Sequence, residues 1–320
     1  MLSYKALGTN IYLAKEDTDR VNTLNSLLIE DGSKARAILI DANYPFRFID
    51  ALYIHIKAPA LGLYCSHGHT DHTAHAFYHL EKYGTPVYCP IQEAEHLKSL
   101  DSLMKDVGFT ELGLEKTFKM MVLEYMKFGI CKQVHTYTPG VNHMEFETVK
   151  IETIHIPGHS PGHTAFKLIS NDDKNRKILY VSDIGSHPYY GDLNCDLPQY
   201  RDSIDKLEKI YLSEDCILIP AHGTVYFEKD EDFFNRIRKR INLNGSKILN
   251  ALIKTTPKSV KDLVLEWILT PKNKANPLIK DLYFLWDGGM IYQHLMEFIA
   301  EGKAQKVEEK DFLNDKYILL

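Results

Sequence analysis

Residues 63–75 read LYCSHGHTDHTAH, and this stretch decides how the rest of the sequence is interpreted. It places four histidines and one aspartate within the nine positions 67–75. The preceding LGLYCS (61–66) is predicted as a buried strand, and TAHAFYHLEKY (73–83) is apolar at helical spacing. The polar residues therefore lie on a strand-to-helix turn, where side chains project together at the carboxyl edge of a sheet.

The composition of this turn indicates metal binding. Imidazole and carboxylate groups are ligands for zinc and for other first-row divalent metals. Four such groups within six residues cannot all bind one tetrahedral ion that keeps a position open for water. The spacing therefore indicates two metals that share the ligands His67, His69, Asp71 and His72.

Three later segments could complete such a site, because each carries a metal-ligand residue next to a predicted strand. HIPGHSPGH (155–163) follows a strand with a Gly/Pro turn, and YVSDIG (180–185) and LIPAHG (218–223) each end one. A carboxylate that bridges two cations holds them roughly 3.5 to 4 Å apart, which suits hydrolysis. The residues that these segments contribute are His159, His163, Asp183 and His222.

Length and composition are those of an ordinary globular chain. The 320 residues are 44% hydrophobic and 25% charged with a net charge of −5, which allows one large unit and a small one and gives no general basic excess for nucleic acid. No apolar run of about 18 residues could span a bilayer, and the N-terminus has no signal-peptide run, so we expect a cytoplasmic protein without a membrane partner. Five scattered cysteines without a C-x-x-C pair indicate neither a disulfide framework nor a thiolate zinc site.

The order of predicted elements divides the chain near residue 240. Strands are predicted over 10–14, 23–30, 36–42, 61–66, 86–90, 149–157, 163–170, 177–183 and 216–222. Helices are predicted over 46–56, 73–83 and 197–212, and a helix-rich passage near 91–132 could form a lid. From residue 233 onward three helices (233–254, 259–269, 288–302) precede two strands about an Asn314-Asp315 turn, which is typical of a winged-helix unit.

Taken together, the H-x-H-x-D-H run, the P-G-H-S-P-G-H segment, the strand-end Asp183 and the P-A-H-G segment resemble the metallo-β-lactamase superfamily in kind and in order. The resemblance implies an α/β fold, the four-layer αβ/βα sandwich, with metals at one edge between two sheets. It implies a catalytic domain over 1–240, with a helical lid-like insert at about 91–147, and a winged-helix-like domain over 241–320. The tail, with Arg236, Arg240 and His294, is similar to the lactamase-β-2-like and glyoxalase II-like branch.

Carried over residue by residue, the resemblance implies one metal held by His67, His69 and His159. It implies a second metal held by Asp71, His72 and His222, with Asp183 as the bridge. Asp41 would orient a ligand histidine from outside the ligand set, and His163 is also expected near the site without binding metal. Two divalent cations are expected, zinc first, with iron or manganese chemically compatible. Ser182 departs from the family pattern, which commonly has glycine before the bridging aspartate.

The expected reaction is hydrolysis by a metal-bridging hydroxide, which Asp71 would orient and whose proton it would pass on. The preferred substrate is a small ester, thioester or lactone. Tyr189 or Tyr190 would supply a hydrogen bond to the oxyanion, and Phe118, Met121 and Tyr125 would form an apolar acyl pocket.

The alternative is an endoribonuclease that acts on single-stranded RNA, with a winged helix to hold the strand. Residues 241–320 contain 11 lysines and no arginine against 10 acidic residues, so charge favours the carbonyl substrate over RNA. A third role for the tail is an interaction surface, for a homodimer or for closing one side of the active site. Apolar positions of the last predicted helix would need such a partner surface: Ile291, Leu295, Phe298 and Ile299.

Overall fold

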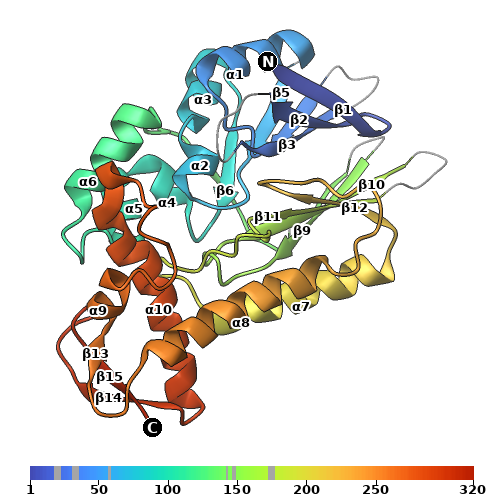
Figure 1. The fold of residues 1–320 in the computed structure, drawn as a ribbon. Coiled ribbons are helices and arrows are strands. Elements are labelled where there is room, and N and C mark those ends of the chain that lie inside the picture. The colour runs from blue at the N-terminus through green and yellow to red at the C-terminus, as the bar shows by residue number, and fades with distance from the viewer. Residues whose placement is uncertain (18–22, 31–35, 57–58, 142, 146–148, 172–176) are drawn as a thin grey trace.

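A computed structural model of the chain contains two large β-sheets that lie between layers of helices (Figure 1). It describes residues 1–17, 23–30, 36–56, 59–141, 143–145, 149–171 and 177–320. The predicted α/β class is confirmed, and so is the four-layer order of helices, sheet, sheet and helices.

The first sheet has seven strands in sequence order. The first four pair antiparallel, and the fourth to seventh pair parallel. The strands are β1 (Leu2–Gly8), β2 (Ile11–Glu16), β3 (Asn25–Glu30), β4 (Ala37–Ile40), β5 (Ala60–Tyr64), β6 (Val87–Pro90) and β7 (His135–Tyr137). Strand β1 was not predicted, because it is an edge strand in which only Leu2 and Leu7 are buried and the apolar alternation is weak.

The second sheet has five strands in the order β12-β11-β10-β9-β8. All its neighbours pair antiparallel except β11 and β12, which are parallel. Strand β12 is buried along its whole length, as expected for a strand covered on both faces. The bounds are β8 (His143–Glu145), β9 (Val149–His155), β10 (Thr164–Ser170), β11 (Lys177–Ser182) and β12 (Cys216–Pro220).

Helices cover the outer faces of both sheets. Those over the first sheet are α1 (Phe46–Ile56), α2 (Thr70–Thr73) and α3 (Ala76–Tyr83), and those under the second are α7 (Leu197–Ser213) and α8 (Phe233–Ala251) (Figure 1). The apolar faces of the two sheets meet in one core, where Leu27 and Ile40 pack with Phe166 and Ile178. A second core lies between the five-stranded sheet and the long helices α7 and α8.

The predicted helix-rich passage is helical in the structure. It contains α4 (Ala94–Lys98), α5 (Leu100–Val107), α6 (Glu115–Lys119) and the π-helix η2 (Met120–Tyr125). It lies beside the histidine-rich stretch 63–75, because the Met126 carbonyl is 2.8 Å from His75 Nε2. Its role as a lid stays a prediction, and residues 142 and 146–147 at its expected end lie outside the described residues.

The C-terminal part contains α9 (Val260–Leu265), η3 (Pro277–Leu282), α10 (Tyr283–Ala300) and a sheet in the order β13-β15-β14. Its strands are β13 (Lys258–Ser259), β14 (Ala304–Glu308) and β15 (Lys316–Leu319). Helix α8 runs continuously across residue 240, where the domain boundary is predicted, so the division into domains stays a prediction.

Two further observations concern the whole chain. All five cysteines are buried as free thiols. In the part of the chain that the structure describes, none of the helices has the length and apolar character needed to cross a membrane.

Backbone contacts join the two large sheets at the segment that leads from β12 to His222. Leu24 forms a β-bridge with His222, and the Asn25 amide donates to the Ala221 carbonyl at 2.7 Å. The Asn25 side chain also donates to the Pro220 carbonyl at 2.8 Å. The end of β12 is therefore fixed against β3, which places His222 opposite the turn that follows β5.

His79, on α3, makes the stability of the folded protein dependent on pH. Its ring is fully buried between the Ala42 carbonyl, 2.9 Å from Nε2, and the Tyr53 hydroxyl, 2.9 Å from Nδ1. Burial lowers the pKa of His79 to about 4. An unfolded histidine, with a pKa of about 6.5, takes up a proton first as the pH falls, so His79 contributes stability above about pH 6.5 that is lost on the way to pH 4.

We expect this loss to reach about 3 kcal/mol, because one pKa unit corresponds to about 1.4 kcal/mol. Urea unfolding of the metal-free protein between pH 4 and 7 measures it. The pH dependence should be clearly flatter in His79→Gln than in the wild type. Equal slopes in the wild type and His79→Gln would refute the assignment.

Candidate metal centre

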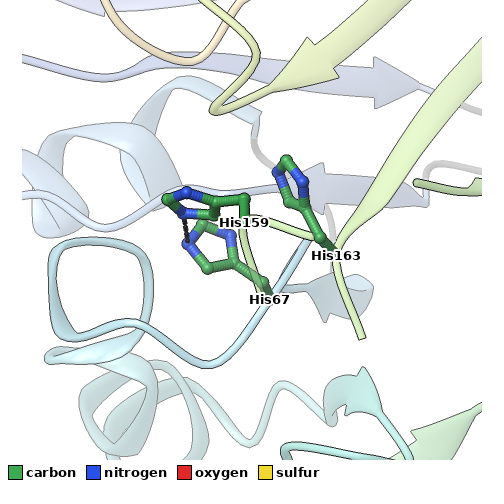
Figure 2. A group of neighbouring side chains, drawn as sticks. All are labelled: His67, His159 and His163. Carbon is green, nitrogen blue, oxygen red and sulfur yellow. Dashed lines mark hydrogen bonds between the residues drawn. The ribbon is translucent and has the colours of Figure 1, made fainter. Parts of the chain in front are cut away.

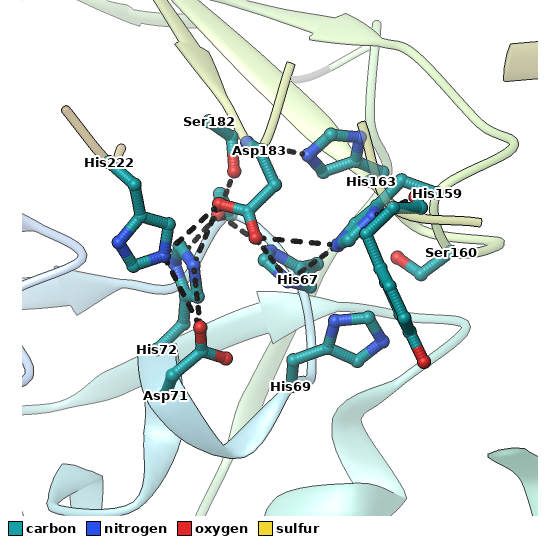
Figure 3. A network of polar contacts seen from close by, with 12 residues as sticks. His67, His69, Asp71, His72, His159, Ser160, His163, Ser182, Asp183 and His222 are labelled. Atoms are coloured by element: carbon teal, nitrogen blue, oxygen red, sulfur yellow. Dashed lines mark hydrogen bonds and ion pairs between the residues drawn. The ribbon is translucent and has the colours of Figure 1, made fainter. Parts of the chain in front are cut away.

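The seven predicted metal ligands lie together in one cluster (Figure 3). They come from four separate places in the chain: the turn after β5, the loop after β9, and the ends of β11 and β12. Potential ligand atoms lie within 4.8 Å of one another in two overlapping sets that concern these residues: Asp71, His72, Asp183 and His222 in one, and His67, His69 and Asp71 in the other.

On one side of the cluster, two histidines face one oxygen of Asp183. The Nε2 atoms of His67 and His159 are 3.3 Å apart. They lie 4.0 Å and 3.5 Å, respectively, from Asp183 Oδ2. Since two ring nitrogens and a carboxylate oxygen point toward the same place, this side offers the atoms that a first cation needs.

On the other side, the second oxygen of Asp183 faces the remaining group. Its Oδ1 lies 3.0 Å from His72 Nε2 and 3.7 Å from His222 Nε2. Asp71 Oδ2 lies 3.3 Å from the same nitrogen of His222. Asp183 therefore presents one oxygen to each side, an arrangement that suits a carboxylate shared by two cations.

The burial of these atoms fits cation binding. Among the described residues, His72 Nε2 and Asp183 Oδ1 are buried without a hydrogen-bond partner, although they are 3.0 Å apart. Polar atoms buried in this way are costly unless another group satisfies them. Imidazole nitrogens and carboxylate oxygens are ligands for zinc, iron and manganese, so the residues fit two divalent cations.

Electrostatics places three of the ligands, Asp71, His67 and His159, in the form that binds a cation. Burial acts to raise the pKa of Asp71, but the neighbouring His72 and His222 outweigh it and lower the pKa to about 2. Burial is also the largest cause that lowers the pKa of His67 and His159, which keeps both rings neutral. Ionised carboxylates and neutral imidazoles are the forms in which these side chains bind metals. Burial opposes a charge on His69, His72 and His222, but neighbouring carboxylates outweigh it and raise the pKa of all three rings.

His163 lies beside His67 and His159 (Figure 2) and has a nitrogen within 4.8 Å of theirs. Both of its ring nitrogens are nevertheless engaged by the protein. The Asp183 amide donates to Nε2 at 3.2 Å, and Nδ1 lies 3.2 Å from the Ile156 carbonyl. His163 therefore fixes the backbone of Asp183, and no nitrogen remains for a cation, in line with the expectation that it binds no metal.

Asp41 lies on the far side of His72 and is fully buried. One oxygen accepts from the Ser66 amide at 2.7 Å, and the other accepts from the Tyr180 hydroxyl at 2.7 Å. The second oxygen is also 3.0 Å from His72 Nδ1. With Nδ1 directed to this carboxylate, the Nε2 of His72 is turned toward Asp183, as a residue that orients a ligand histidine should do.

We expect Asp41→Asn to weaken metal binding by about 10- to 100-fold, because the asparagine NH2 group accepts no hydrogen bond and must face either the Ser66 amide or the donors Tyr180 and His72. Competition with a chromophoric chelator measures the dissociation constants of both ions. The weaker ion should be the one beside His72. Asp202→Asn, an exposed change on α7, is the control and should bind as the wild type does. Unaltered affinities in Asp41→Asn would contradict this role.

Ser182 stands where the resemblance leads us to expect glycine, and its backbone conformation shows why glycine would suit this position. Its φ is 50°, in the left-handed region where glycine is favoured. Its hydroxyl is 2.7 Å from the Ser66 hydroxyl, which in turn lies 3.0 Å from His67 Nδ1. The serine thus accepts an unfavourable backbone conformation and adds a buried hydrogen bond next to a ligand histidine.

Glu93 is a site residue that the sequence analysis missed. Its carboxylate is buried and accepts from the Gly68 and Gly162 amides, both at 2.5 Å, and from the Ser160 hydroxyl at 2.7 Å. It therefore ties together the two turns that carry His67 and His159. The available signal was its position after β6, because the predicted ligands also follow the ends of strands.

Asp192 was also missed. Its side chain is buried, and Oδ2 lies 3.0 Å from His69 Nε2, off the axis of an ideal hydrogen bond. Burial opposes a charge on His69, but the carboxylate outweighs it and raises the pKa of His69 to about 9. Nothing in the sequence singles out this aspartate within the loop 183–196.

The five residues predicted for a substrate pocket do not form one group, although Phe118 and Met121 belong to the same apolar cluster. Tyr189 is next to the cluster, since its carbonyl is 2.9 Å from His159 Nδ1. Tyr190 is fully buried, and its hydroxyl is 2.9 Å from His294 Nε2 on α10. Phe118 is buried and stacks on Phe109, Met121 is half-buried, and Tyr125 is 63% exposed.

Comparison with known proteins gives structural matches alone. No family model and no curated protein matches the sequence. The structure is similar to a β-lactamase domain protein from Burkholderia ambifaria, with a TM-score of 0.71 and 13% identity, over 99% of this chain and 93% of that one.

A metallo-β-lactamase family protein from Thermus thermophilus gives a TM-score of 0.68 and 16% identity, over 98% of this chain and all of that one. A metallo-β-lactamase from Cronobacter sakazakii gives 0.51 and 14%, over 74% of this chain and 93% of that one. At such low identities the likeness establishes the fold, and the first two matches extend it through the C-terminal part.

Proposed function

The chain has the metallo-β-lactamase fold, and on that premise we propose that it is a hydrolase that uses two divalent metal ions on a small ester, thioester or lactone. The observation that carries the proposal is the position of Asp183. Its two carboxylate oxygens face two separate groups of histidine nitrogens. A carboxylate placed in this way can be shared by two cations, one on each side.

The proposed ligands are His67, His69 and His159 for one ion and Asp71, His72 and His222 for the other, with Asp183 shared. When bound, two divalent cations lower the pKa of a coordinated water and polarise a carbonyl oxygen. Zinc is our first choice, because nitrogen and carboxylate donors suit it, and iron or manganese would suit the same donors.

Asp71 is the residue that we assign to proton transfer. Its side chain is 39% exposed, whereas that of Asp183 is 13% exposed, so it can reach both the cluster and solvent. Its low pKa keeps the carboxylate ionised near neutral pH, where it can accept a hydrogen bond from the attacking water and orient it.

The pairing of charged side chains supports a carbonyl substrate over RNA. In the basic stretch NRIRKR (235–240), two of the four cations are paired: Arg236 with Asp230, and Arg238 with Asp205 and Glu208. In the C-terminal sheet, Lys306 pairs with Asp315. Cations that are already paired with carboxylates are poor binders of a phosphate backbone.

For the C-terminal part, we propose a winged-helix-like unit. The order of α8, β13, α9, α10, β14 and β15, with the three strands in one antiparallel sheet, supports this interpretation. The apolar residues that were expected to need a partner surface pack inside the chain. Ile291 and Leu295 are fully buried, Phe298 is 7% exposed, and Ile299 is half-buried against the same cluster. Because these side chains are covered by the chain itself, they do not support a homodimer formed through this face of α10.

A parallel assay of the metal-loaded protein tests the substrate class. Aryl esters, acyl thioesters, lactones and single-stranded RNA are incubated with the same preparation and with a metal-free control. We expect turnover of one or more carbonyl substrates that disappears with a chelator and returns with added metal. Cleavage of RNA alone would overturn the proposed substrate class and leave the metal centre standing.

A further inference from the structure

The loop between β11 and α7 lies between the candidate metal centre and helix α10. Two of its residues contact proposed ligands of the first ion. The Tyr189 carbonyl is 2.9 Å from His159 Nδ1, and Asp192 Oδ2 is 3.0 Å from His69 Nε2. These two residues are linked to each other, because the Tyr189 hydroxyl donates to Asp192 Oδ1 at 2.6 Å.

Both contacts have consequences for the ligand rings. When Nδ1 of His159 donates to a carbonyl, its Nε2 is left free to face His67 and Asp183. In His69, the carboxylate of Asp192 lies 3.0 Å from Nε2, which leaves Nδ1 as the nitrogen that can face a cation. Asp192 is only 5% exposed, so its carboxylate is held in this position by the surrounding protein.

The opposite side of the same loop packs against α10, and of the described glycines Gly289 leaves the least room for a Cβ atom. A Cβ atom added at Gly289 would lie 1.8 Å from the Gly191 carbonyl oxygen, and one added at Gly191 would lie 2.2 Å from the Trp286 carbonyl oxygen. Glycine at both positions therefore allows the loop and the helix to touch backbone to backbone.

Side chains hold the loop to the helix on either side of this contact. The Tyr190 hydroxyl is 2.9 Å from His294 Nε2, and His294 Nδ1 is 3.0 Å from Glu297 Oε2. Gln293 donates to the Cys195 carbonyl at 2.8 Å. Residues 190 to 195 are thus fixed on α10 while residues 189 and 192 contact the ligand histidines.

We propose that α10 sets the orientation of His69 and His159 through this loop, with Asp192 as the positioning residue and Gly289 as the point of contact. The inference rests on the proposed function, in which these histidines bind the first ion. It gives the C-terminal part a role in building the metal centre that is separate from dimer formation and from substrate contact. Loss of a residue that orients a metal ligand commonly weakens binding about 10- to 100-fold.

Two adjacent glycines of α10 provide a matched test. Gly289→Ala forces the loop away from the helix, whereas a Cβ at Gly288 meets its nearest atom, Val260 Cγ1, at 3.4 Å, an ordinary contact. Both changes have the same effect on helix propensity, so a difference between them reports the contact with the loop. We expect Gly289→Ala to weaken the first ion about 10- to 100-fold and Gly288→Ala to bind as the wild type does.

Asp192→Asn tests the positioning residue with little change in size, and the exposed Asp202→Asn is its control. Cobalt titration followed by visible absorption reports the number and coordination of bound ions, and chelator competition gives both dissociation constants. We expect Asp192→Asn to weaken the binding of the first ion and to change the spectrum of cobalt at that position, while the second ion stays bound. If Gly289→Ala does not fold, as judged by circular dichroism, Asp192→Asn decides the test.

The failure of this inference is distinguishable from that of the proposed function. A wild-type protein that binds two ions, with affinities and spectra unaltered in Asp192→Asn and in folded Gly289→Ala, would overturn the inference alone. A wild-type protein that binds no divalent ion would overturn the proposed function and the inference with it.

Discussion

Asp183→Ala is expected to bind at most one metal ion per chain and to lower kcat/KM on the best carbonyl substrate on the order of 1,000-fold. In the structure, the two oxygens of Asp183 face different groups of histidines, Oδ2 facing His67 and His159 and Oδ1 facing His72 and His222. Its removal takes a negatively charged ligand from each cation at once. The remaining proposed ligands are His67, His69 and His159 on one side and Asp71, His72 and His222 on the other. A loss on that order corresponds to about 4 kcal/mol of transition-state stabilisation.

Elemental analysis and steady-state kinetics of the same preparation measure both effects. Asp202→Ala is the control, because its side chain is exposed on α7 and away from the cluster. Asp183→Asn should fall between the wild type and the alanine variant, since the amide keeps one oxygen that can bind a cation. Two ions per chain together with near-wild-type turnover in Asp183→Ala would refute the bridging role.

Glu93→Ala is expected to lower the free energy of unfolding by about 3 to 5 kcal/mol, because three buried donors lose their acceptor and a cavity remains. Those donors are the amides of Gly68 and Gly162 and the hydroxyl of Ser160. They belong to the turns that carry the proposed ligands of the first ion. We therefore also expect weaker metal binding in whatever fraction of Glu93→Ala folds.

Urea unfolding with and without metal measures this effect. Glu95→Ala is the matched control, since the Glu95 side chain is 67% exposed and its ion pair with Lys98 is solvated. Surface pairs of this kind contribute about 0 to 1 kcal/mol. The stability of Glu93→Gln should lie between those of the two alanine variants, because the glutamine NH2 group would face one of the donors that Glu93 now accepts from. Equal stabilities of Glu93→Ala and Glu95→Ala would contradict the role of Glu93.

Much of the fold was accessible from the sequence because local patterns determine it. Buried strands such as β5 and β12 are short apolar runs that end where polar ligands begin, and α7 and α8 show helical periodicity. The proposed metal ligands were accessible for a related reason. Four of them are packed into residues 67–72, and such a concentration of imidazole and carboxylate groups is rare without a metal.

The parts that were missed depend on contacts between distant segments. Glu93 and Asp192 are single acidic residues without a local motif, and their importance comes from amides and rings that lie 25 to 123 positions away, counted from residue 93 to residue 68 and from residue 192 to residue 69. The residues predicted for one substrate pocket lie in different surroundings for the same reason. Tyr190 follows Tyr189 directly, yet its hydroxyl contacts α10 while the carbonyl of Tyr189 contacts a ligand histidine.

The most direct test of the two-ion centre is the metal content of the protein after purification without added metal and after reconstitution with zinc. Inductively coupled plasma mass spectrometry on the wild type, His67→Ala and His222→Ala separates the two sides of Asp183. The geometry predicts two ions per chain in the reconstituted wild type and one in each variant. One ion or none in the reconstituted wild type, or two in both variants, would contradict it.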